Sequence, residues 1–248
     1  MFSKQQQKYV QSLQIKKYRQ EHHSFLVEGA KSVIELIDSD FGIELVLCTS
    51  KFFEENEKKI KKISVEQISQ TELEKISTLK SNDSAVAIVK MKPNIYLKTT
   101  ENEFVLVLDD IRDPGNLGTI LRIADWYGIK KVVCSDTTVD LYNPKVIAAS
   151  MGSFTRIQAF YTNLQAYFEQ ISTHMPAIIG TFLNHTNLHK FSFPNAGYII
   201  LGNESNGIGE AVEKFVTDKV TIPRFGHAES LNVGIATAIV LDNLMRRK

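Results

Sequence analysis

The stretch FVLVLDDIRDPGNLGTILRIADWYGIKKVVCSD, residues 104–136, decides the fold of the larger part of this chain. An apolar run opens it, a polar loop leads into a segment that can form a helix from Gly115 to Tyr127, and a second apolar run closes it. The positions expected to face inward on that helix are Leu117, Ile120, Leu121 and Ala124. Short apolar strands separated by helices predict a parallel sheet that is covered on both faces.

The same alternation continues toward the C-terminus. We expect strands in the segments AIIGTFL, YIILGNE and DKVTIP, and helices in NPKVIAASM and SLNVGIATAIVLDNLMRRK. Polar loops follow three of the predicted strands, including the strand that opens the stretch quoted above. Because open α/β sheets bind their ligands at the carboxyl ends of the strands, these three loops predict a functional site.

Each loop by itself has an ordinary structural explanation. In the first, Asn116 could cap a helix and Arg122 could be a surface residue of that helix. In the second, GNESNGIG, the glycines permit either a plain tight turn or a close approach of the backbone around Glu204 to a ligand. In the third, Ser230 and Asn232 both stand at a helix start, which is more than one cap requires.

Two common nucleotide-binding motifs are absent from the sequence. No G-x-G-x-x-G follows the first strand of the larger segment, which argues against a dinucleotide-dependent oxidoreductase, and no G-K-[ST] marks a P-loop. No cluster of Cys and His residues has the spacing of a metal site, so we expect no metal.

Taken together, in this order and spacing, the loops resemble the three motifs of the SpoU (TrmH) family, within the SPOUT class of methyltransferases. The patterns Asn-x-Gly-x₃-Arg, Gly-x-Glu-x₂-Gly and Ile-Pro…Ser-Leu-Asn-Val of that family all occur in this chain. The matched positions are Asn116, Gly118, Arg122, Gly202, Glu204, Gly207, Ile222, Pro223, Ser230, Leu231, Asn232 and Val233. The resemblance covers residues 104–247, and it extends more weakly to the front, where KKYRQEHHSFLVEGAK resembles the start of an L30e-like substrate-binding domain.

The resemblance implies a fold and an activity. The fold is an α/β parallel sheet with a C-terminal trefoil knot of the SPOUT type, preceded by a small α/β L30e-like domain, in a homodimer whose active site borrows from both subunits. The activity is transfer of a methyl group from S-adenosylmethionine to a ribose 2′-hydroxyl of structured RNA, with ribosomal RNA (rRNA) favoured over transfer RNA (tRNA). The alternatives are a tRNA 2′-O-methyltransferase and a non-catalytic RNA-binding protein of the same fold, and the intact Asn116 and Arg122 argue against the latter.

The resemblance also assigns roles to residues, with Arg122 as the proposed catalytic agent. Whether Arg122 acts as a base stays open; because a guanidinium remains protonated in almost any protein site, we favour stabilisation of the developing alkoxide. The predicted catalytic residues are Arg122, Asn116, Glu204, Ser230 and Asn232. The predicted cofactor-binding residues are Gly202, Ile222 and Leu231, with Thr181, Phe182 and Leu183 closing an apolar pocket.

The first part of the chain predicts a separate small α/β unit. We expect a strand and a helix in FLVEGAKSVIELIDS, strands in IELVLCTS and AVAIVKM, and a capped helix in SVEQISQTELEKIS. The segment KMKPNIYLKTTENE contains a proline and several lysines, as a linker does. The predicted organisation is an RNA substrate-binding domain over residues 1–92, a linker over 93–102 and a methyltransferase domain over 103–248.

Charge limits how the chain could bind RNA. The 248 residues carry a formal net charge of +1, which excludes binding by bulk charge and leaves local basic patches. Lys16, Lys17 and Arg19 form such a patch in a domain without a catalytic motif, so they are predicted to contact RNA phosphates.

The sequence predicts a cytoplasmic protein that does not contact a membrane. No apolar run approaches the ~20 residues that span a bilayer, and the segment MFSKQQQKYVQ is too polar for a signal peptide. Cys48 and Cys134 lie in strand-like apolar runs, so we expect buried thiols rather than a disulfide.

Overall fold

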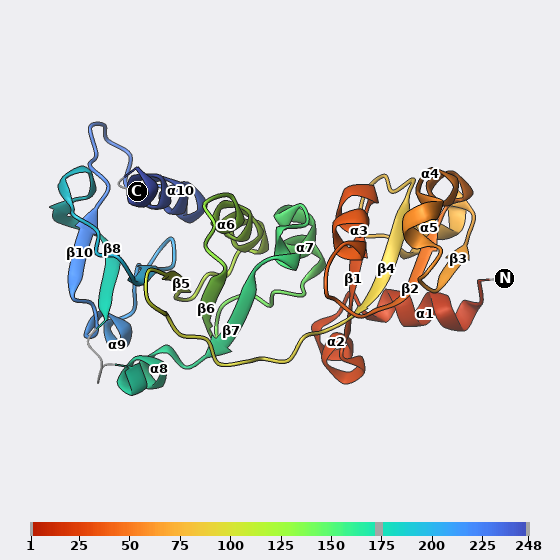
Figure 1. The fold of residues 1–248 in the computed structure, drawn as a ribbon, viewed down its shortest axis with the longest axis horizontal. Helices are drawn as coiled ribbons and strands as arrows, with labels where there is room; N and C mark the ends of the chain where they lie inside the picture. The colour runs from red at the N-terminus through yellow and green to blue at the C-terminus, as the bar shows by residue number, and fades with distance from the viewer. Residues whose placement is uncertain (1, 172–175, 247–248) are drawn as a thin grey trace. The chain divides into compact units, whose positions relative to one another are not determined.

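The computed structural model describes residues 2–171 and 176–246 and is drawn in Figure 1. Its internal contacts divide the chain into two compact units. The first consists of Met1–Pro93 with Asp140–Thr155, and the second of Asn94–Val139 with Arg156–Lys248. The last two residues of the helix expected at the C-terminus lie outside the described residues.

The first unit contains a four-stranded mixed sheet in the order β1-β4-β2-β3. Its strands are β1 Ser24–Glu28, β2 Ile43–Cys48, β3 Val65–Gln67 and β4 Ala85–Lys90. Its helices are α1 Lys4–Ser12, α2 Lys16–His22, α3 Ala30–Ile37, α4 Ser50–Ile60, α5 Gln70–Ile76 and α7 Pro144–Ser150. β4 pairs antiparallel with β1 and β2, whereas β3 lies parallel to β2. The segment SVEQISQTELEKIS forms β3 and then α5, so only its second half is the predicted helix.

Residues 140–155 belong to the first unit although they lie in the middle of the predicted methyltransferase domain. Phe154 is fully buried, with its ring 6.1 Å from that of Phe25 and 5.6 Å from that of Phe41. Tyr142 packs against Phe25 with a ring separation of 4.5 Å. This segment therefore completes the aromatic core of the N-terminal unit, so the unit is not continuous in sequence.

Arg19 is a buried structural residue, which corrects its prediction as an RNA-binding residue. Only 2% of it is exposed, and its Nη2 lies 2.7 Å from Oδ2 of Asp140, which also accepts from Nε at 3.2 Å. Its Nη1 donates to the carbonyl oxygens of Leu13 at 3.1 Å and Gln14 at 2.8 Å. These bonds use four of the five guanidinium N–H groups, so Arg19 is not available to an RNA phosphate.

The second unit contains a six-stranded, wholly parallel sheet in the order β10-β8-β9-β5-β6-β7. Its strands are β5 Phe104–Leu108, β6 Lys131–Ser135, β7 Gln158–Thr162, β8 Ala177–Asn187, β9 Gly197–Leu201 and β10 Asp218–Thr221. Its helices are α6 Pro114–Trp126, α8 Leu164–Ile171, α9 Glu210–Glu213 and α10 Val233–Met245, with a 3-10 turn at Leu188–Lys190. The predicted parallel α/β sheet is confirmed, and the trefoil knot stays a prediction.

The strand order places a topological switch between β5 and β9. From β5 the chain builds β6 and β7 on one side, and then crosses to the other side for β8, β9 and β10. Leu108 at the end of β5 pairs with Leu201 at the end of β9. The loops that start at Asp109 and Gly202 therefore begin side by side, in the position where α/β sheets bind ligands.

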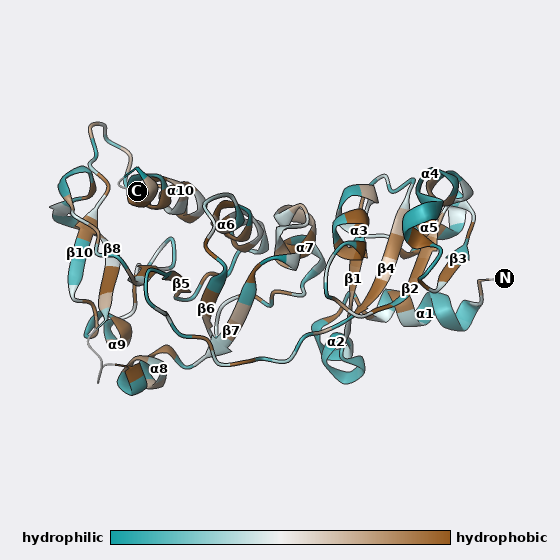
Figure 2. Cartoon of the chain, in the orientation of Figure 1, coloured by the Kyte–Doolittle hydropathy of each residue, from teal (hydrophilic) through white to brown (hydrophobic). Residues whose placement is uncertain are grey.

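Helices cover both faces of this sheet. Figure 1 shows α6 and α10 on one face and α8 and α9 on the other, and Figure 2 shows apolar residues gathered on the strands between them. α6 and α10 approach closely at glycines: Gly118 is buried, and a Cβ on Gly234 would lie 3.0 Å from Cγ2 of Thr119. The close packing of these two helices joins the start of α10 to the first half of α6.

Cys48 and Cys134 are both buried and unbonded thiols, as the sequence predicts. Burial raises the pKa of the Cys48 thiol to about 11 and that of Cys134 to about 12. Within the described part of the chain, no helix is both long and apolar enough to cross a membrane.

Replacing Arg19 by Met should lower the free energy of unfolding of the first unit by about 3–5 kcal/mol, because it leaves the mostly buried carboxylate of Asp140 without its partner. Denaturant titration followed by circular dichroism would measure this. Lys59→Met is the matched control: Lys59 pairs with Asp38 at side-chain exposures of 47% and 59%, so its loss should cost about 0–1 kcal/mol. Equal unfolding midpoints for the two variants would contradict the structural role of Arg19.

Candidate active site

Two acidic residues at the end of β5 form hydrogen bonds with the loop that follows β9. Oδ2 of Asp109 accepts the backbone N–H of Gly209 at 2.8 Å, and Nδ2 of Asn203 donates to the carbonyl of Asp110 at 2.8 Å. Burial raises the pKa of Asp109, and the neighbouring charge of Asp110 raises it further, while the bond from Gly209 works in the opposite direction. These contacts hold the first and second predicted loops against each other.

The loop over residues 202–207 is closed by its own backbone. Asn203 and Gly207 exchange two backbone hydrogen bonds of 3.0 and 2.9 Å, and the side-chain oxygen of Asn203 accepts the N–H groups of Ser205 and Asn206. A Cβ at Gly202 would lie 2.1 Å from the carbonyl carbon of Gly207, so only glycine fits there. The loop is therefore a preformed turn that presents Glu204.

Three of the predicted catalytic residues form one hydrogen-bonded row. Nδ2 of Asn116 donates to Oε1 of Glu204, and Oδ1 of Asn116 accepts from Nδ2 of Asn232 at 2.8 Å. The row joins the first turn of α6, the loop after β9 and the N-terminal cap of α10. We call Glu204, Asn116 and Asn232 the polar row.

The orientation of each amide in the polar row is fixed from both ends. Oδ1 of Asn232 accepts the N–H groups of Gly234 and Ile235 as a helix cap, so its Nδ2 must be the group that faces Asn116. Asn116 must then accept through its oxygen and donate through its nitrogen to the carboxylate of Glu204. At neutral pH an ionised aspartate of the same size could only accept, so the amide of Asn116 is what serves both bonds.

Arg122 and Ser230, the other predicted catalytic residues, do not join the polar row. Both are exposed, and neither side chain has a hydrogen-bond or ion-pair partner among residues 2–171 and 176–246. Arg122 lies six residues after Asn116 on α6, which puts it roughly 9 Å along the helix and about 120° around it. Within one chain, the guanidinium and the polar row therefore face different directions.

The predicted cofactor residues Thr181, Phe182 and Leu183 lie on β8, Gly202 and Ile222 directly follow the neighbouring strands β9 and β10, and Leu231 lies in the loop before α10. β8 pairs with β10 through Lys219↔Gly180 and then Val220↔Thr186, so residues 181–185 of β8 bulge out of the ladder. The hydroxyl of Thr181 donates to the carbonyl of Ile200 at 3.2 Å, and the carbonyl of Phe182 accepts from the hydroxyl of Thr221 at 2.8 Å. Leu183, within this bulge, is 63% exposed, and Leu231 in the loop before α10 is 46% exposed, so both present apolar surface.

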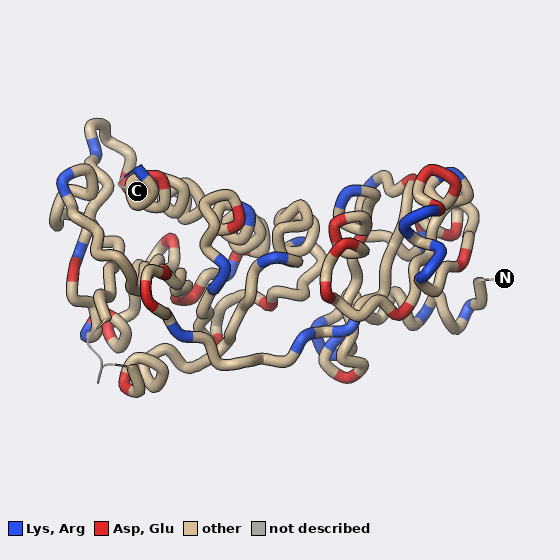
Figure 3. Tube along the Cα trace, viewed as in Figure 1, with Lys and Arg blue, Asp and Glu red and all other residues tan. Residues whose placement is uncertain are grey.

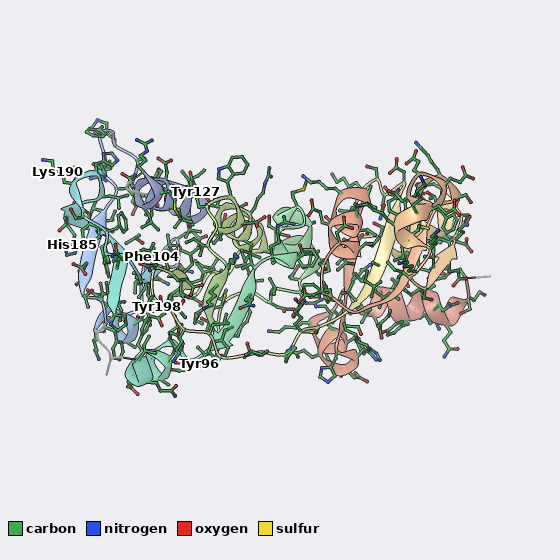
Figure 4. All side chains as sticks on the ribbon, viewed as in Figure 1. Tyr96, Phe104, Tyr127, His185, Lys190 and Tyr198 are labelled. Atoms are coloured by element: carbon green, nitrogen blue, oxygen red, sulfur yellow. The ribbon has the colours of Figure 1, made fainter. Side chains whose placement is uncertain are left out.

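A cavity of about 880 Å³ lies beside the predicted cofactor residues but shares only Ile222 with them. Its other lining residues include Tyr127, Ala238, Ile239 and Asp242. Figure 4 shows Tyr127 at the end of α6 next to α10, where its hydroxyl is 3.5 Å from Oδ1 of Asp242. None of the residues of the polar row lines this cavity, which we call the outer cavity.

Asp109, Asp110 and Asn203 support the site but received no role from the sequence. Their hydrogen bonds connect segments that are 93 to 100 residues apart. An Asn inside a turn bounded by glycines is a signal for a side chain that bonds its own loop. That signal could have identified Asn203, whereas the partners of Asp109 and Asp110 follow only from the sheet order.

The fold and site define an RNA methyltransferase. A protein from Porphyromonas gingivalis assigned to the TrmH family of RNA methyltransferases matches with a TM-score of 0.88 at 31% identity over 100% of both chains. The S-adenosylmethionine-bound rRNA methyltransferase from Sinorhizobium meliloti also gives a TM-score of 0.88, at 27% identity over 97% of this chain and 94% of that one.

The chain belongs to the SpoU rRNA methylase family, whose model matches residues 103–242, more than half of it. The model of an MRM3-like substrate-binding domain matches residues 4–87. Among curated proteins, the 23S rRNA (guanosine(2553)-2′-O)-methyltransferase RlmP of Bacillus subtilis is 29% identical over 94% of this chain and 92% of its own length. The predictions of the family, of the enzyme class and of S-adenosylmethionine as cofactor are confirmed.

Asn116→Asp should disable the polar row at neutral pH, because two carboxylates would replace an amide–carboxylate hydrogen bond. As the pH falls, one proton shared by the carboxyl pair restores a donor, so the methyl-transfer rate of the variant should rise relative to wild type. Single-turnover kinetics over a pH series would measure the ratio of the two rates. Asn116→Ala is the control and should show no recovery in acid; the same flat ratio for Asn116→Asp would argue against the row.

Proposed function

We propose that this chain transfers a methyl group from S-adenosylmethionine to a ribose 2′-hydroxyl of rRNA. The observation that carries the proposal is the polar row, which unites one residue from each of the three family motifs. The likeness to RlmP over 94% of the chain supports rRNA as the substrate. Mapping 2′-O-methyl groups in rRNA and tRNA from a deletion strain tests the proposal. Loss of a methyl group from tRNA alone would identify tRNA, and not rRNA, as the substrate.

The residues around the bulge of β8 fit an adenosine-containing cofactor. S-adenosylmethionine supplies a methyl group on a positively charged sulfur. The bulge leaves backbone groups of residues 181–185 outside the ladder, and the side chain of Leu183 within it is exposed and apolar. Backbone hydrogen bonds with an apolar slot are what an adenine ring requires. We propose that the residues that hold it are Gly202, Ile222, Leu231, Thr181, Phe182 and Leu183.

The polar row would orient the ribose. Asn116 engages one carboxylate oxygen of Glu204, and the other oxygen has no partner among the described residues. That oxygen can accept the hydrogen bond of the 2′-hydroxyl, or of a guanidinium that approaches it. Ser230 is exposed two residues before Asn232 and offers a further hydroxyl to the RNA.

Arg122 would supply the charge for the reaction. Negative charge develops on the ribose oxygen as its proton leaves, and a guanidinium placed there stabilises that charge only when it appears. Its constant protonation suits this role better than that of a base. We propose Arg122 as the catalytic residue, with Asn116, Glu204, Ser230 and Asn232 positioning the ribose.

A homodimer would complete the site. Arg122 and the polar row face different directions in one chain, so a second copy could bring its guanidinium to the row. Apolar surface for such a contact exists along α10, where Ile235 is 52% exposed and Ala238 and Ile239 line the outer cavity. Figure 3 shows that both acidic and basic residues are distributed along the chain.

We propose that the N-terminal unit recognises the RNA. Lys16 and Lys17 are exposed, and the match to a substrate-binding domain over residues 4–87 supports this role. Arg19 is excluded from the surface for the reason given above. The boundaries at residues 93 and 102 and the cytoplasmic location stay predictions.

Gly202→Ala should weaken cofactor binding at least tenfold, because the added Cβ meets the backbone of Gly207 and must open the preformed turn. Calorimetric titration with S-adenosylmethionine would measure the change in affinity. Gly226→Ala is the matched control, since a Cβ there meets nothing within 4 Å. Unchanged affinity in Gly202→Ala would separate this turn from the cofactor site.

Arg122→Ala should fold, dimerise and bind cofactor, yet transfer methyl groups on the order of 10²–10³-fold more slowly. Arg122→Lys should recover little, because an ammonium lacks the planar fork that addresses hydroxyl and phosphate together. Single-turnover kinetics at saturating cofactor would measure both variants. Near-normal transfer by Arg122→Ala would leave Glu204 as the next candidate.

Light scattering at micromolar concentration should report about twice the monomer mass of 28.0 kDa. The reason is that the proposed site of a single chain lacks a guanidinium at its polar row, so it needs Arg122 of a second copy. A variant with a charge in the α10 contact, Ile239→Glu, should be monomeric and inactive while it still folds. A monomer with full methyl-transfer activity would refute the shared site.

A further inference from the structure

α6 carries an exposed ridge that the proposed reaction uses only in part. Thr119, Arg122 and Trp126 are all exposed, and they lie within about 60° of one another around the helix. They stand opposite the buried side of α6, which contributes Leu117, Leu121 and Ala124 to the core. We call these three exposed residues the α6 ridge.

Trp126 is the unusual member of this ridge. It is the single tryptophan of the chain, and 84% of its surface is exposed. An indole buries well and carries a flat π face, so an exposed indole on a regular helix is a ready platform for another flat group. Its position late in the 13-residue α6 makes that platform rigid rather than part of a loop.

The charges around Trp126 favour an anionic partner. Arg122 lies one turn before Trp126 and has no ion-pair partner among the described residues. The carboxylate next to the indole, Asp125, is neutralised by Arg156, whose Nη2 lies 2.8 Å from it. Lys130, just beyond the helix, is exposed as well. An aromatic platform between cations is the arrangement that binds unpaired nucleic acid.

The α6 ridge is continuous with the polar row. The start of α10 packs on α6 beside Thr119, because a Cβ on Gly234 would lie 3.0 Å from the Thr119 methyl group. Asn232, the cap of α10, is two residues before Gly234 and belongs to the polar row. RNA bound next to Asn232 therefore lies beside Thr119, and Trp126 follows roughly 10 Å further along α6.

We propose that Trp126 stacks on an unpaired base of the RNA substrate, adjacent to the nucleotide whose ribose is methylated. This rests on the proposed function, and it adds a base-contacting residue to it. Stacking is tolerant of base identity, so Trp126 would require an unstacked nucleotide rather than a particular sequence. Lys130 would meet the adjoining phosphate.

A second copy of the chain is the competing occupant, and the geometry favours another surface for it. The apolar cavity beside α10 is lined by Tyr127, which points about 100° around α6 from Trp126. Ala238 and Ile239 give the cavity apolar walls, although Asp242 and Arg246 line it as well. The cavity offers a second copy a contact on the Tyr127 side of α6, while the cations around Trp126 favour RNA as the partner of the indole.

The single tryptophan makes the unaltered protein its own probe. In the RNA-free dimer, acrylamide should quench Trp126 emission as it quenches free indole. Oligoadenylate should quench the emission saturably, while polyphosphate and a blunt RNA duplex of equal length should leave it nearly unchanged, because neither offers an unpaired base. Emission that acrylamide cannot reach in the RNA-free dimer would assign Trp126 to the subunit contact and overturn the proposal.

Substitution supplies the second readout. Trp126→Ala should raise KM for an unmodified rRNA transcript on the order of 10-fold to 100-fold, with kcat, cofactor affinity and dimer mass preserved. Trp126→Phe should recover most of the loss, since it keeps a stacking face. Ile95→Ala removes a comparable exposed apolar side chain, 62% exposed, and should leave KM unchanged.

The outcomes separate this inference from the proposed function. If wild type methylates the transcript and Trp126→Ala does so with an unchanged KM, stacking at Trp126 is refuted while the methyltransferase assignment stands. If wild type methylates no RNA, the proposed function itself fails. A loss in Trp126→Ala that Trp126→Phe does not recover would point to helix packing and would also overturn the stacking role.

Discussion

The two hydrogen bonds of the Asn116 side chain are the interaction on which the candidate site depends. They connect Asn116 with Glu204, 88 residues away, and with Asn232, 116 residues away. An amide is required because one neighbour is a carboxylate that only accepts, and the other is an amide whose oxygen already caps a helix. The pairing of β9 with β5 and the packing of α10 on α6 bring these three side chains within hydrogen-bonding distance of one another.

Orientation and charge are divided between two sides of α6. The residues of the polar row hydrogen-bond to one another and form no ion pair with any cation that the structure describes. The row can therefore hold a ribose without a bound ion. Arg122 stands on the α6 ridge without a carboxylate partner among the described residues, so its charge is not consumed by a salt bridge. A residue that is to stabilise a charge arising only during reaction has to be uncommitted in the resting state. In the proposed mechanism, the guanidinium therefore comes to the polar row from a second copy of the chain.

In the N-terminal unit, the tertiary structure divides the predicted basic patch of Lys16, Lys17 and Arg19 between the surface and the interior. Lys16 and Lys17 stay at the surface, but Arg19 turns inward to Asp140, a residue of the segment between β6 and β7. Phe154 of the same segment fills the aromatic core of that unit. Deleting residues 1–92 would therefore expose Phe154 and leave the carboxylate of Asp140 without its partner Arg19. Point substitutions are for this reason the sounder test of RNA recognition.

The sequence by itself determined the family, the parallel sheet and the identity of the motif residues, because periodicity and close motif spacing are local properties of the chain. It also located Glu204 in a glycine-bounded turn, since glycine is demanded by the backbone there. Only the tertiary structure decided which motif residues touch: the row of Glu204, Asn116 and Asn232 formed, whereas Arg122 and Ser230 stayed apart. The pairing of Arg19 with Asp140 and the bonds of Asp109 and Asp110 to the loop after β9 were likewise invisible, because they join residues that lie 93 to 121 positions apart. Such contacts depend on strand order and helix packing, and no local pattern encodes them.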